Sequence, residues 1–171
     1  MLTIKSVKDI KHSEHMQVEK INVMQLFSLD SEKFEEIHDI CQFQKGNNII
    51  KNKICKGLMS LSWLDVAEIK DYFQSMNVEG IVAALKIVFG LKEKEILHLN
   101  IKEFYQAFNW IQDELLKIYK AEKKLSSKPD SKLKEAGIED LNIFGDLNSL
   151  IAIGEKFSKS PQEVEKWNYS L

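Results

Sequence analysis

The 171-residue sequence contains no arginine, and all 24 of its basic residues are lysines. Arginine is the side chain that binds phosphates and carboxylates in two-point geometry, so its absence argues against sites of that kind. The net charge of −2 and the pI of about 6.1 provide no overall positive field for nucleic acid. We therefore expect no nucleic-acid partner.

Cysteine is also scarce, because two residues are too few for a disulfide framework in a chain of this length. No stretch of the sequence approaches the roughly 18 apolar residues that a membrane span requires. The N-terminus lacks the continuous apolar run of a signal peptide. These absences predict reduced thiols, no membrane partner and a cytoplasmic protein.

The residues that are present favour helices. Apolar residues make up 44% of the chain and charged residues 29%, while there are only 7 glycines and 2 prolines, which favours a mainly α-helical fold. Residues 78–89 are apolar on nearly every face, which predicts a buried central helix that ends at Gly90. Residues 101–125 carry one apolar stripe at helical spacing. Ser160 and Pro161 predict the clean start of a last helix.

The chain is predicted to form a compact helical bundle over 1–125, joined by a linker at 126–130 to a C-terminal helical subdomain at 131–171. The linker contains two serines and a proline but no large apolar residue. The extended segment 1–30 fits either a short β-hairpin or one poor helix. Further helices are predicted with N-caps at Ser31 and Ser62, over 49–61, and at 131–136 and 146–157.

Two pairs of side chains raise the question of a metal site. His12 and His15 are three residues apart, as are His38 and Cys41, and together they form an acceptable set of zinc ligands. The alternative is solvated histidines and a core thiol, which we prefer because a second cysteine pair is missing. We predict no metal and no cofactor, and keep a small metal-binding regulator as an alternative function.

No motif indicates catalysis. The seven glycines are scattered singly, so no phosphate-binding loop is present. Neither cysteine lies in a sequence context typical of a catalytic nucleophile. The abundant carboxylates are expected to lie on solvent-exposed faces of helices. We therefore predict no catalytic residue and no enzymatic activity.

Aromatic residues are the best candidates for contacts with other proteins. An exposed tryptophan often anchors an interface, and Trp110 falls off the main apolar stripe of its helix. The alternative for each tryptophan is ordinary partial burial in a small helical domain. Exposed aromatics also make a homo-oligomer an option. The predicted partner-binding residues are Trp63, Trp110, Phe157, Val164, Trp167 and Tyr169.

The end of the chain resembles a known family. The apolar helix over 150–157, followed by Ser-Pro-Gln-Glu-Val-Glu-Lys-Trp over 160–167, resembles the C-terminal part of phage tail assembly chaperones. Residues 61–125 are compatible with the helical body of that family. The resemblance implies a role without catalysis, in which the protein coats the tape-measure protein and recruits tail-tube subunits.

The same resemblance implies phage structural or assembly proteins as partners and the host cytoplasm as the place of action. The alternative is a structural component of the virion, such as a connector, a tail protein or a packaged internal protein. These two functions differ in one observable way, because a virion component is present in mature particles and a chaperone is not.

Overall fold

The computed structural model describes residues 21–55, 57–75, 77–125 and 146–169, and this part of the chain is mainly α-helical, as predicted. The α-helices are α2 (Val23–Phe27), α3 (Ser31–Cys41), α4 (Trp63–Ser75), α5 (Val78–Phe89), α6 (Glu93–Leu97), α7 (Ile101–Leu125), α9 (Asp146–Phe157) and α10 (Pro161–Val164). The strands are β1 (Ile49–Ile50) and β2 (Lys53–Ile54), and η2 (Leu58–Ser60) is a turn of 3-10 helix.

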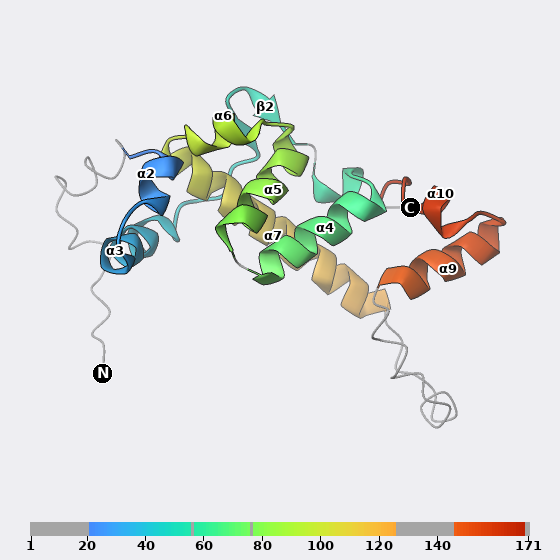
Figure 1. Ribbon diagram of the computed structural model, residues 1–171. Coiled ribbons are helices and arrows are strands. Elements are labelled where there is room, and N and C mark those ends of the chain that lie inside the picture. Colours follow the sequence, from blue (N-terminus) through green and yellow to red (C-terminus); the bar gives the residue numbers. More distant parts are fainter. Residues whose placement is uncertain (1–20, 56, 76, 126–145, 170–171) are drawn as a thin grey trace.

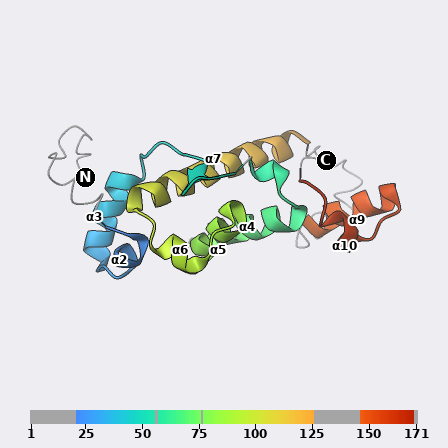
Figure 2. The ribbon, with the colours of Figure 1, turned by 90° about the horizontal axis from the view of Figure 1, so that it is seen from above.

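The molecule is elongated along α7. Figure 1 shows α2 and α3 at one end and α9 and α10 at the other. Seen from above in Figure 2, α7 runs along one side, and α4, α5 and α6 follow one another along the opposite side. One hydrophobic core fills the space between these two sides, with Ile69, Leu85, Ile96 and Ile111 completely buried in it. Each of these residues comes from a different helix, so the core joins α4, α5, α6 and α7.

The two strongest sequence patterns are confirmed. The apolar helix α5 lies in the core, and Gly90 ends it in the left-handed conformation, with φ 59°. The apolar stripe of α7 faces the same core, where Phe108 stacks on Phe73 of α4 at 5.2 Å between ring centroids. Burial of these stripes holds the two sides of the molecule together.

The predicted helix over 49–61 is wrong. β1 and β2 form an antiparallel hairpin there, followed by η2, and Lys51 and Asn52 take positive φ values in its turn. The hairpin is favoured because Ile50 is completely buried and because the ammonium groups of Lys51 and Lys53 donate to main-chain oxygens in α6 and just after α5. These contacts join distant parts of the chain, so they override the local preference for a helix.

The described part of the N-terminal segment contains α2 and no strand. Asn22 makes an isolated bridge to Asn100, which ties the start of α2 to the start of α7. A β-hairpin in this segment is therefore wrong for the part that can be described. Residues 1–20, which include His12 and His15, lie outside the described residues, as do the predicted linker and the predicted helix over 131–136.

Of the two predicted N-caps, Ser62 is confirmed and Ser31 is wrong. Ser62 caps α4, because its hydroxyl oxygen accepts the N–H of Asp65 at 3.1 Å. Ser31 is not a cap, because the Asp30 carboxylate accepts the N–H of Lys33 at 3.0 Å and Ser31 is already the first helical residue. Aspartate and serine cap helices about equally well, so the sequence alone does not separate these two neighbours.

The two thiols are expected to be unreactive in the folded protein. Both are buried, and burial raises the pKa of Cys41 to about 11 and also raises the pKa of Cys55. The thiolate is the reactive form, so very little of it is present at neutral pH. An aromatic disulfide reagent should release no signal from the native protein within minutes and two thiols per chain after unfolding in guanidinium. Rapid release of a thiol from the native protein would contradict this burial.

Candidate functional site

The C-terminal arm consists of α9, α10 and residues 165–169, which we call the tail. The start of α10, predicted from Ser160 and Pro161, is fixed by a capping box. The Ser160 hydroxyl accepts the N–H of Glu163 at 3.3 Å, and the Glu163 carboxylate accepts the N–H of Ser160 at 3.0 Å. Pro161 occupies the first helical position, where its missing N–H costs nothing.

Inside the arm, α10 packs on α9. A Cβ on Gly154 would lie 2.6 Å from the main-chain oxygen of Lys159, so only glycine allows the chain to turn this closely from α9 into α10. Leu150 and Val164 are buried in the arm. Val164, which the sequence predicts as a partner-binding residue, is completely buried in the structure and so presents no side chain to a partner.

The tail pairs with the start of α4. The first N–H groups of a helix have no partner within the helix, and here the tail supplies oxygens for two of them, while Ser62 serves Asp65. Ser62 and Asn168 form the bridge at the centre of this pairing. The main-chain hydrogen bonds are Trp63 N–H to Trp167 O (3.1 Å), Leu64 N–H to Glu165 O (3.2 Å) and Tyr169 N–H to Leu61 O (2.9 Å).

Four of the six predicted partner-binding residues come together at this junction. The rings of Trp63 and Tyr169 lie 4.4 Å apart between centroids, and those of Phe157 and Trp167 lie 5.6 Å apart, edge to face. The sequence identifies these aromatics one by one. It does not predict that the tail brings Trp63 of α4 to the arm.

Trp110 does not belong to this group. It is half-buried on α7, where it packs against the core and lies 6.0 Å from Phe89 between ring centroids. Gly46 approaches its main chain from the other side. Its position off the apolar stripe of α7 is therefore explained by packing against the loop that follows α3.

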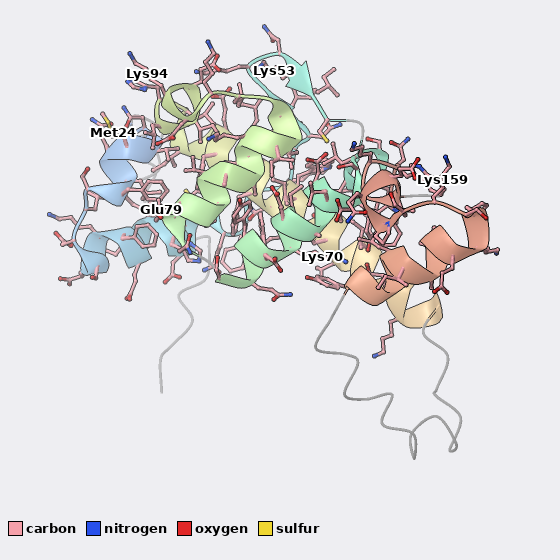
Figure 3. The ribbon with its side chains drawn as sticks, turned by 45° about the vertical axis from the view of Figure 1, so that its right-hand side comes forward. Met24, Lys53, Lys70, Glu79, Lys94 and Lys159 are labelled. Atoms are coloured by element: carbon pink, nitrogen blue, oxygen red, sulfur yellow. The ribbon has the colours of Figure 1, made fainter. Side chains whose placement is uncertain are left out.

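Beneath the aromatics lies a polar group that the sequence analysis missed. The Lys70 ammonium is 2.7 Å from Glu122 Oε1 and donates to the Tyr169 hydroxyl at 2.8 Å, and that hydroxyl also donates to Glu122. Lys70 is only 7% exposed and lies 5.0 Å from the centroid of the Tyr169 ring. Figure 3 labels Lys70 where α4, α7 and the arm meet. The tail is thus joined to two helices of the body at once.

The state of the Tyr169 phenol follows from these surroundings. Burial, together with the hydrogen bond to Glu122, raises its pKa to about 12 against the opposing effect of Lys70. The phenol therefore keeps its proton at neutral pH and donates a hydrogen bond to the Glu122 carboxylate. One signal in the sequence could have indicated Lys70, which shares the buried face of α4 with Val66, Ile69 and Phe73.

The arm also presents apolar side chains to solvent. Phe157 is 56% exposed and Ile151 is 40% exposed, both on α9. Trp167 is half-buried beside Phe157. We call Phe157 and Trp167, whose rings contact each other, the arm surface; Phe157 is the last residue of α9, which lies at the end of the molecule opposite α2 and α3 (Figures 1 and 2).

Of the four candidate zinc ligands, His38 and Cys41 lie among the described residues, and both are used inside the fold. His38 Nδ1 lies 3.1 Å from the Tyr105 hydroxyl, and its ring stacks on that of Phe34. Cys41 is buried in the core. Within the described ranges, no three histidine, cysteine, aspartate or glutamate residues gather closely enough to hold a metal ion.

The comparisons with known proteins give no relative. No family model, no curated protein and no solved structure matches the chain. Among the helices that the structure describes, none combines the length and the apolar character needed to cross a membrane.

Proposed function

We propose that the protein acts without catalysis, by binding other proteins through the arm surface. The observation that carries this proposal is the exposure of Phe157 at the end of α9, in contact with the ring of the half-buried Trp167. Single exposed apolar residues are normal on soluble proteins. An exposed aromatic ring packed beside a tryptophan is typical of the centre of a protein interface.

In its specific form, the proposal is a role in phage particle assembly, as a tail assembly chaperone. It is supported by the resemblance of 150–157 and 160–167 to the ends of such chaperones, since both stretches lie in the arm and contain Phe157 and Trp167 of the arm surface. In this role the arm surface would contact the tape-measure protein or a tail-tube subunit in the host cytoplasm. A structural component of the virion would use the same surface permanently.

The test is to tag the full chain in its native source, capture it and identify the co-purifying proteins by mass spectrometry. Recovery of tape-measure or tail-tube proteins, with the chain missing from purified particles, is the result expected of a chaperone. Recovery at a fixed ratio with mature structural proteins would make the chain a virion component. Recovery of host proteins alone would overturn the phage role.

The arm surface itself is tested by Phe157→Ser. Truncating a hot-spot residue costs about 2 kcal/mol or more, and ~1.4 kcal/mol corresponds to a tenfold change in affinity, so we expect this substitution to reduce capture of the partner by at least about tenfold. Its effect on unfolding should stay below about 1 kcal/mol, since the ring is more than half exposed. Phe43→Ser is the matched control, because Phe43 is 71% exposed and follows α3 at the opposite end. Equal capture by the two variants would contradict the assignment of the arm surface.

A further inference from the structure

The arm is joined to residues 21–125, which we call the body, through the tail. Among the described residues, the hydrogen bonds and ring contacts between the arm and the body all involve residues 165–169. Leu150 and Val164, the buried apolar side chains of the arm, do not belong to the hydrophobic core of the body. Separation of the tail from α4 therefore leaves the buried residues of both parts in place.

The tail has turns of its own, which do not depend on α4. The N–H of Glu165 donates to the oxygen of Pro161 at 2.9 Å, and the N–H of Trp167 donates to the oxygen of Val164 at 2.9 Å. The contacts of Glu165 and Trp167 with α4 use their carbonyl oxygens instead. Separation therefore breaks the hydrogen bonds between the tail and α4 and keeps those within the arm.

The groups of the body that contact the tail keep a partner when the tail separates. The Lys70 ammonium contacts Glu122 directly at 2.7 Å, so this buried charge stays paired. The main-chain groups of Leu61, Trp63 and Leu64 belong to residues that are half-buried or exposed, so water can replace the tail. A polar group left buried without a partner would make separation costly. The start of α4 avoids that cost.

We propose that the tail is a latch over Trp63, and that this latch opens while the body stays folded. In the closed form the ring of Tyr169 lies 4.4 Å from that of Trp63 between centroids, so it covers part of the tryptophan. A protein that contacts this part of Trp63 must first release the tail. Local opening of a few contacts costs less free energy than unfolding of a core. The inference concerns one chain alone and does not rest on a partner binding the arm surface.

Hydrogen exchange of the full chain, followed residue by residue by NMR, tests the latch. The N–H groups of Trp63 and Leu64 donate to oxygens of the tail, and the N–H of Tyr169 donates to the oxygen of Leu61. The N–H of Ile111, a completely buried residue of α7, reports on the body. After correction for intrinsic rates, the first three should exchange together and at least about tenfold faster than the last. Equal rates for all four would overturn the proposal, because the tail would then leave only on complete unfolding.

Tyr169→Phe tests whether the tail controls this exchange. The substitution keeps the ring and removes the hydrogen bonds of the hydroxyl with Lys70 and Glu122. Hydrogen bonds to charged groups are among the stronger ones in proteins, so exchange at Trp63 and Leu64 should accelerate at least about tenfold. Exchange in the core should not change, which shows that the body is still folded. If the two amides at the start of α4 kept their rates, the proposal would be overturned.

Two controls distinguish the latch from fraying of α4 and from a general loss of stability. The N–H of Asp65 donates to the Ser62 hydroxyl, not to the tail, so Tyr169→Phe should leave its exchange unchanged. Tyr119→Phe makes the same chemical change 5.8 Å from the Lys70 ammonium, measured to the ring centroid. Among the described residues the Tyr119 hydroxyl has no hydrogen bond, so this variant should not accelerate the latch amides. Equal acceleration in either control would overturn the proposal.

Discussion

Replacing Glu122 with alanine is expected to lower the free energy of unfolding by about 3 kcal/mol, because removing one partner of a buried ion pair typically costs 3–5 kcal/mol. The Lys70 ammonium lies 2.7 Å from the carboxylate, so it would stay buried and lose the negative charge of Glu122 beside it. We place the effect at the low end of the range because the Glu122 side chain is about a third exposed. The Tyr169 hydroxyl would lose an acceptor as well. Urea denaturation of the full chain measures the change.

A second ion pair on the same helix provides the control. Lys117 contacts Glu114 at 2.5 Å, but its side chain is 68% exposed, so Lys117→Ala should cost less than about 1 kcal/mol. Glu122→Gln separates charge from hydrogen bonding, since it removes the charge and keeps an oxygen for the Tyr169 hydroxyl. Its cost should lie between the other two. Equal costs for Glu122→Ala and Lys117→Ala would contradict a special role for the buried pair.

The parts of the fold that could be predicted are those determined locally. Residues 78–89 and 101–125 combine a strong apolar pattern with end signals, and both helices have these bounds in the structure. The start of α10 is similarly determined by Ser160 and Pro161, neighbours in the sequence. In these segments the residues that decide the structure are within one or two helical turns of each other.

The hairpin could not be predicted because distant residues decide it. The apolar residues of 49–54 fit a helix as well as a strand. What favours the strand is the burial of Ile50 and the hydrogen bonds of Lys51 and Lys53 to main-chain oxygens in α6 and just after α5, about 40 positions further along the chain. The sequence pattern around 49–54 contains no information about those helix ends.

In the candidate site, too, features carried by single residues could be predicted, and features that depend on distant contacts could not. The tryptophans and the terminal aromatics stand out by residue type, and four of them do meet. Lys70 could be noticed only by its place among the apolar residues on one face of α4, and Glu122 does not stand out, because it resembles the solvated charges on many helices. Their role appears only when the tail places Tyr169, which is 99 positions from Lys70, between them.

Replacing Gly46 with alanine is expected to lower the free energy of unfolding by about 2–3 kcal/mol, in the upper part of the range for overpacking. A Cβ at this position would lie 2.8 Å from Cα and 2.9 Å from the main-chain nitrogen of Trp110. Both are main-chain atoms of α7, so relief requires the helix or the loop to move. The loop is held in place by the N–H of Asn47, which donates to the oxygen of Gln106 at 2.9 Å. Urea denaturation again provides the measurement.

Gly90→Ala is the control, because it introduces backbone strain without any close contact. Gly90 has φ 59°, and a Cβ there would meet nothing within 4 Å, so its substitution should cost only about 1 kcal/mol. A clearly larger cost at Gly46 would mean that the loop presses on α7 and fixes Trp110 in the core. Equal costs would mean that the loop yields easily. Trp110 could then become exposed by a small movement of the loop, which would restore it as a candidate contact for a partner.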